Sequence, residues 1–134
     1  MKLWNGYGSE HSANLVMIGR FKNATTPEQV KAIFDQLTQQ ADTDRAAGVL
    51  DTDGTTTKYS DPMLALLGRL HVHSVAPWEL EQFLNDVTVE VKGQEVVLTT
   101  QEYDVSAFLK VLIDHGARVD VFSAHDYKDS GYGR

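Results

Sequence analysis

The sequence predicts an α+β protein in which helices cover one face of an antiparallel sheet. Three patterns point to this class: a continuous apolar strand at 15–22, a hairpin at 88–100, and a helix followed by a strand at 104–124. Apolar residues recur every three or four positions in the helices and every second position in the hairpin strands, which buries one face of each of these elements. We expect a single domain over residues 1–134, because this length supports one sizeable core.

The first firm element is the strand at 15–22. Leu15 to Ile18 form a continuous apolar run, which is typical of a strand covered on both faces. We therefore place this strand near the centre of the sheet. Upstream, Leu3 and Trp4 can add a short edge strand before a glycine-rich turn.

A helix is predicted at 27–42. Thr26, Pro27 and Gln29 form a strong start signal, because threonine caps a first turn, proline fits there and glutamine can complete a capping box. The apolar positions share one face, which we expect to cover the sheet. These positions are Val30, Ile33, Phe34, Leu37 and Ala41.

Residues 43–87 are predicted to form a largely helical insertion. Its first part lacks periodicity, which indicates a long loop or a small hairpin around Asp53-Gly54. A short helix begins at Asp61-Pro62. A brief alternation at 70–75 predicts a short strand, and Pro77 opens another helix.

The hairpin at 88–100 is the most specific local prediction. Gly93 and Gln94 separate two strands, and a two-residue loop that begins with glycine indicates a type II′ turn. Folding about this loop places the apolar residues of both strands on one face. The expected pairs are Lys92 with Glu95, Val91 with Val96, Glu90 with Val97, and Val89 with Leu98.

The last predicted unit is a helix at 104–115 followed by a strand at 118–124. Asp104 is the predicted cap, and Tyr103 and Phe108 have the spacing of a hydrophobic staple. The helix is expected to end at the glycine of residue 116, since glycine tolerates the left-handed backbone that closes many helices.

Together the firm elements run strand, helix, strand, strand, helix, strand. This βαββαβ order is that of a ferredoxin-like antiparallel sheet with helices on one face, here with a helical insertion at about 43–87. We expect the first and last strands to be adjacent and parallel, which would place the start of one and the end of the other at opposite ends of the sheet. The alternative is a different α+β sandwich that uses a strand of the insertion.

Composition restricts the compartment and the classes of partner. The chain has no cysteine, which excludes disulfides and thiolate metal sites and fits a cytoplasmic protein. No apolar run is long enough for a signal-peptide core or a membrane span, so we expect no membrane partner. The formal net charge of −7 disfavours nucleic acid and anionic membranes and suits a basic protein partner.

His71 and His73 are the candidate metal ligands. Side chains two apart on a strand share a face, so this pair could bind zinc or another divalent metal. A metal site needs three or four ligands. The acid and histidine neighbours at 10–11 and 125–126 could supply the others if the fold brings them near.

The segment WNGYGSEHSANL at residues 4–15 resembles the start of short bacterial proteins that form a family of unknown function. The resemblance concerns the first part of the chain and implies no activity, cofactor or catalytic residue. If W-x-G-Y-G-S-E-H-S is the signature of that family, it directs attention to Glu10 and His11.

Because no complete catalytic motif is present, the sequence predicts a small acidic protein that acts by protein binding. It would be a homodimer subunit, a regulator or an immunity-type antidote, and loop aromatics such as Trp78 suit an interface. No cofactor is predicted. The alternative is a hydrolase that uses Glu10 and His11 for acid-base catalysis, or His71 and His73 to bind a divalent metal such as zinc.

Overall fold

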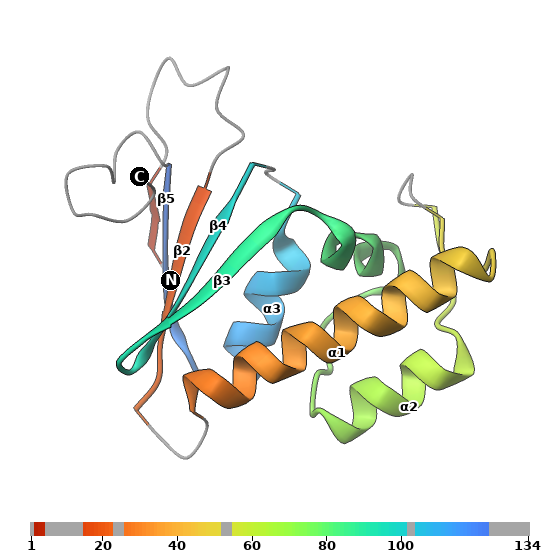
Figure 1. Cartoon of the computed structure of the whole chain (residues 1–134), viewed down its shortest axis with the longest axis horizontal. Helices are drawn as coiled ribbons and strands as arrows, with labels where there is room; N and C mark the ends of the chain where they lie inside the picture. The colour runs from red at the N-terminus through yellow and green to blue at the C-terminus, as the bar shows by residue number, and fades with distance from the viewer. Residues whose placement is uncertain (1, 5–14, 23–25, 52–54, 102–103, 124–134) are drawn as a thin grey trace.

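The computed structural model describes residues 2–4, 15–22, 26–51, 55–101 and 104–123. Five strands form one sheet in the order β1-β5-β2-β4-β3, with helices beside it, so the α+β class is confirmed (Figure 1). The strands are β1 (Lys2–Trp4), β2 (Leu15–Arg20), β3 (Val87–Lys92), β4 (Glu95–Thr100) and β5 (Arg118–Ser123). The helices are α1 (Pro27–Ala46), α2 (Asp61–Arg69), the 3-10 helix η1 (Pro77–Leu84) and α3 (Ser106–Asp114).

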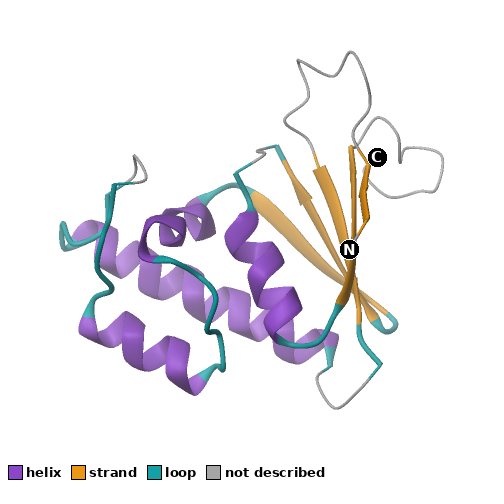
Figure 2. Cartoon of the chain, turned by 180° about the vertical axis from the view of Figure 1, so that it is seen from behind, coloured by secondary structure: helices purple, strands orange, loops and turns teal. Residues whose placement is uncertain are grey.

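The helices lie on one face of the sheet, and the main core fills the space between the two layers (Figures 1 and 2). At its centre three rings meet, one each from α1, η1 and α3. The ring centroid of Phe108 is 5.2 Å from that of Phe34 and 5.2 Å from that of Phe83. Such tilted and edge-on contacts are favourable aromatic geometries. α2 packs against α1, away from the sheet.

β2 is central, as predicted. Its residues Leu15 to Gly19 are all buried, and it pairs with β4 on one side and β5 on the other. Gly19 allows α3 to approach closely, because a β-carbon there would lie 3.0 Å from a methyl group of Leu112. The short edge strand predicted at the N-terminus is also present, as β1 alongside β5.

The predicted direction of the last strand relative to the first was wrong. β2 and β5 are adjacent but antiparallel, with Leu15 opposite Ser123. α3 is the crossover that brings β5 back parallel to β4, and β2 lies between these two strands, antiparallel to both. The start of β2 and the end of β5 therefore lie at the same end of the sheet, and the predicted separation does not hold.

Two local predictions are confirmed in detail. Thr26 and Gln29 form the capping box of α1: the Thr26 hydroxyl accepts from the Gln29 backbone N–H at 3.2 Å, and the reverse bond is 2.8 Å. α1 extends beyond the predicted end, to Ala46. The β3–β4 hairpin has the predicted register at every pair. Gly93 has φ +61° and Gln94 does not adopt positive φ, as a type II′ turn requires.

Candidate functional site

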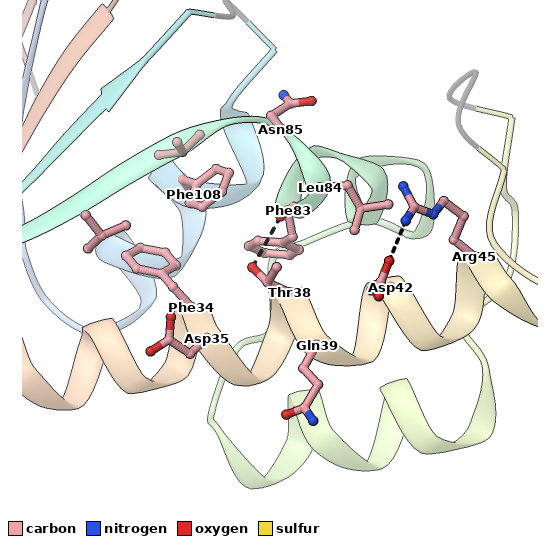
Figure 3. A pocket seen from close by; sticks show the side chains of 12 residues that line it. Phe34, Asp35, Thr38, Gln39, Asp42, Arg45, Phe83, Leu84, Asn85 and Phe108 are labelled. Atoms are coloured by element: carbon pink, nitrogen blue, oxygen red, sulfur yellow. Dashed lines mark hydrogen bonds and ion pairs between the residues drawn. The ribbon is translucent and has the colours of Figure 1, made fainter.

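A groove of about 470 Å³ lies between α1, η1 and β3 (Figure 3). Its floor consists of Phe34, Phe83 and Phe108, each at most 2% exposed. The half-buried side chains around this floor come from the end of η1, from β3 and, at Thr38, from α1, and the exposed ones come from α1. The other lining residues are Asp35, Thr38, Gln39, Asp42, Arg45, Leu84, Asn85, Val87 and Val89.

The rim of the groove is polar and slightly acidic. Arg45 and Asp42 form an ion pair at 2.5 Å on the exposed side of α1, which leaves the carboxylate of Asp35 without an ion pair among the described residues. The hydroxyl of Thr38 donates to the backbone carbonyl of Phe83 at 3.2 Å and ties α1 to η1. The groove therefore combines an apolar floor with a polar rim, which is the arrangement of many binding surfaces.

The edge of the sheet runs along this groove. β3 pairs with β4 on one side, and no strand in the described part of the chain pairs with its other side. Val87 and Val89 are half-buried and pack against the core, while Thr88 and Glu90 are exposed on the opposite face. A strand edge presents unpaired backbone N–H and C=O groups, to which another strand can be added.

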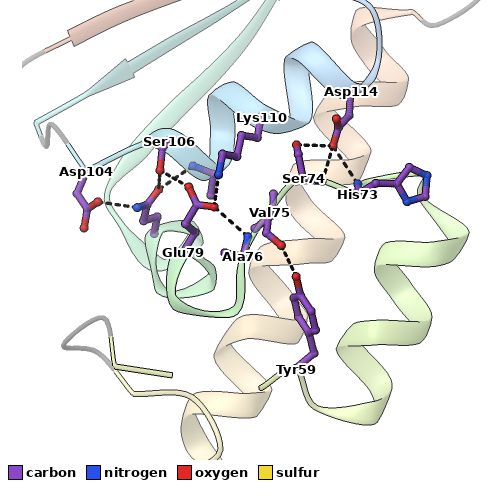
Figure 4. Close-up of polar contacts among 12 residues, drawn as sticks. Tyr59, His73, Ser74, Val75, Ala76, Glu79, Asp104, Ser106, Lys110 and Asp114 are labelled. Carbon is purple, nitrogen blue, oxygen red and sulfur yellow. Dashed lines mark hydrogen bonds and ion pairs between the residues drawn. The ribbon is translucent and has the colours of Figure 1, made fainter. Parts of the chain in front are cut away.

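On its other side, η1 meets α3 through a buried carboxylate (Figure 4). Glu79 is fully buried; one of its oxygens accepts from Lys110 Nζ at 2.6 Å and from the Ala76 backbone N–H at 2.9 Å. The other oxygen accepts from the Ser106 hydroxyl. Burial raises the pKa of Glu79, but these hydrogen bonds and the Lys110 charge together lower it by more. The pKa of Glu79 therefore lies below its ordinary value.

Gln82, one turn further along η1, caps α3. Its side-chain oxygen accepts from the Ala107 backbone N–H at 2.7 Å, and its nitrogen donates to Asp104 at 2.5 Å. The prediction that Asp104 caps the helix was wrong, because Val105 is the N-cap and has no side-chain cap bond. The predicted Tyr103 staple lies outside the described residues. One feature of the sequence could have indicated this buried polar contact. Glu79 and Gln82 share a helix face with Phe83, so two polar residues occupy core positions.

The segment that contains His71 and His73 forms a turn, and the predicted strand at 70–75 is absent. His71 has φ +55° and closes α2 by the hydrogen bonds of a Schellman motif. Its N–H donates to Gly68 at 3.3 Å and the Val72 N–H donates to Leu67 at 3.0 Å. Val72 and Leu67 are both buried. The apolar alternation therefore arises from a helix end that buries Val72.

The described residues do not complete a metal site. The rings of His71 and His73 are 6.2 Å apart between centroids, and no group of three or more histidine or acidic side chains converges within the described ranges. Asp114 accepts hydrogen bonds from the backbone N–H groups of His73 and Ser74 at 2.9 and 3.2 Å (Figure 4). The candidate pair Glu10 and His11, like residues 125–126, lies outside the described residues.

The described helices include none that is long and apolar enough to cross a membrane. Comparison with curated proteins and with solved structures gives no match. Comparison with family models gives one match that spans residues 1–134, so the resemblance predicted from the opening segment is confirmed and extends over the whole chain. The chain belongs to a family of unknown function, DUF6375.

Proposed function

We propose that this chain acts by binding another polypeptide in the groove between α1, η1 and β3. The role would be that of a homodimer subunit, a regulator or an immunity-type antidote. The observation that carries the proposal is the groove itself: half-buried Leu84, Val87 and Val89 line it above three buried phenylalanines, beside a sheet edge that pairs with no described strand.

The chemistry of the groove favours binding over catalysis. Its lining contains two carboxylates, Asp35 and Asp42, and the second is held by Arg45. No histidine of the described part of the chain lines it, whereas acid-base catalysis needs groups that converge on a reacting atom. Half-buried Leu84, Val87 and Val89 would instead lose water on contact with a partner, which stabilises a complex by about 25 cal/mol per Å² of apolar surface.

We also propose that the core is of the ferredoxin-like type. Without β1, the sheet order is β5-β2-β4-β3 with every neighbouring pair antiparallel. The position of the helices on one face supports the same assignment. In this arrangement β3 is an edge strand, so the fold places the groove and a free edge side by side.

A matched pair of variants tests the binding role. Leu84→Lys places a charge in the groove, and Leu64→Lys places the same charge on α2, where Leu64 is 56% exposed. Both proteins and the parent would be immobilised and exposed to native lysate, and the bound proteins would be quantified by mass spectrometry. We expect a protein, or further copies of this chain, to be retained by the parent and by Leu64→Lys but lost with Leu84→Lys.

The proposal fails if the two variants retain the same set of proteins as the parent in the same amounts. Circular dichroism and thermal unfolding of both variants provide the control for folding. If Leu84→Lys loses the bound protein because it unfolds, the test is repeated with Asp35→Lys. Asp35 is an exposed residue at the same groove, so this substitution should leave the fold intact.

A further inference from the structure

The edge of β3 that pairs with no described strand is regular over its whole length. Its six residues pair with β4 in unbroken register, so no bulge bends the strand away. β1, at the opposite edge of the sheet, has three residues. Proteins usually protect a long edge by a bulge, a proline or an inward-pointing charge. β3 has none of these three: its helix-facing residues are valines, and the exposed charges of Glu90 and Lys92, which also discourage edge pairing, lie on the opposite face.

An identical strand fits this edge in one register. Two copies paired antiparallel about a two-fold axis must place like faces together. When Val89 lies opposite Val89, Thr88 lies opposite Glu90 and Asp86 lies opposite Lys92, so the ends carry complementary charges. The next possible register on one side places Glu90 opposite Asp86, and the next on the other side places Glu90 opposite Glu90. Like charges directly opposite each other are destabilising.

The same pairing would cover the groove from its open side. The valines of the second copy would lie next to Val87 and Val89, which border the phenylalanine floor. These two side chains are only half-buried in the single chain, so pairing removes apolar surface from water as well as completing backbone hydrogen bonds.

We propose that a second copy of this chain docks on β3 in the register centred on Val89 and forms one continuous sheet across both copies. This inference rests on the proposed function, because it names the partner for the same groove and edge. The charges at the two ends of the strand select the register, and the valines supply the apolar contact.

Single cysteines test this register directly, because the chain has no cysteine of its own. Val89→Cys places the two cysteines opposite each other across the axis. Their α-carbons would be about 4.5–5.5 Å apart, a distance that suits a disulfide. Val91→Cys is the matched control, since its two copies would be about 13 Å apart. Under mild oxidation at micromolar protein, we expect Val89→Cys to form the covalent dimer at least about tenfold faster than Val91→Cys.

The double variant Val87→Cys/Val91→Cys should restore rapid cross-linking, because residue 87 of one copy lies opposite residue 91 of the other. Equal rates for Val89→Cys and Val91→Cys, or a faster reaction of Val91→Cys, would overturn the proposal. If cross-linking fails while Leu84→Lys still loses a partner from lysate, the groove binds a different protein and only the second-copy inference is wrong. If both tests fail, the binding role itself is wrong.

Discussion

The two sides of η1 are built in different ways. Towards α3, Glu79 and Gln82 are buried and their polar atoms are engaged by Lys110, Ser106, Ala107 and neighbouring backbone. Towards α1, the hydroxyl of Thr38 provides a hydrogen bond, and a groove of about 470 Å³ remains. A buried polar network that is fully satisfied specifies one arrangement of its elements. The closed side therefore positions η1, and the open side is where we propose that a partner binds.

The largest effect is expected on the closed side. Glu79→Ala removes a buried acceptor and leaves Lys110 and the Ala76 N–H without the carboxylate that accepts from them, so we expect the free energy of unfolding to fall by about 2–4 kcal/mol. Urea unfolding measures it. Glu90→Ala is the control, because the Glu90–Lys92 ion pair is exposed and should contribute at most about 1 kcal/mol. Equal losses for the two variants would mean that the buried Glu79 network stabilises the fold no more than an exposed ion pair does.

The same carboxylate predicts a pH dependence. The pKa of folded Glu79 is lowered from its ordinary value of 4.5, so near that pH the unfolded chain binds more protons than the folded chain. Stability from Glu79 is therefore present above about pH 4.5 and is lost as the pH falls through the folded pKa. Comparison of Glu79→Gln with the parent between pH 6 and pH 3 should show their difference in unfolding free energy shrinking towards the acid end. A difference that grows on acidification would contradict this assignment.

The sequence predicted the elements that depend on local spacing. The β3–β4 register follows from Gly93-Gln94 and the alternation around it, and the start of α1 follows from Thr26 and Gln29. The relative direction of β2 and β5 requires the whole path of the chain, and the prediction went wrong there.

The groove could not be predicted from the sequence. The groove is formed by α1, η1 and β3, which are far apart along the chain. Phe34 was predicted to lie on the apolar face of its helix, but no local pattern shows that its ring lies in one cluster with those of Phe83 and Phe108. His71 and His73 were predicted as metal ligands because the alternation around them indicated a strand. That alternation results instead from the turn that closes α2.

The ends of the helices, away from the groove, test a smaller effect: the cost of positive φ at a residue other than glycine. α1 and α3 close through Gly48 (φ +78°) and Gly116 (φ +80°), whereas α2 closes through His71 (φ +55°). A β-carbon at Gly116 would contact nothing within 4 Å, so Gly116→Ala isolates the backbone term and should cost about 1 kcal/mol. His71→Gly should raise the unfolding free energy by about 0.5 kcal/mol, because glycine adopts positive φ without strain while its greater freedom in the unfolded chain offsets part of the gain.

Thermal and urea unfolding of both variants check these signs. A stability loss in His71→Gly would mean that the imidazole stabilises the turn by more than the left-handed backbone costs, and the helix ends would then no longer differ as described.

On the open side, a lysine introduced at residue 88 or at residue 89 should have opposite effects on the association of two copies. Val89→Lys puts a charge on the axis of the proposed pairing and should weaken association, while Thr88→Lys faces Glu90 of the second copy and should strengthen it. Both variants should remain folded, because Thr88 is exposed and Val89 borders the groove, where a lysine can reach water. Equal effects on association would contradict the register.

The molar mass of the unmodified chain tests the central claim most directly. Light scattering across a dilution series, from micromolar to millimolar, should give a mass that rises from the 14.9 kDa of one chain towards twice that value, with Val89→Lys remaining at the lower mass throughout. A parent protein that stays at 14.9 kDa over the whole range would contradict the claim that a second copy occupies the β3 edge.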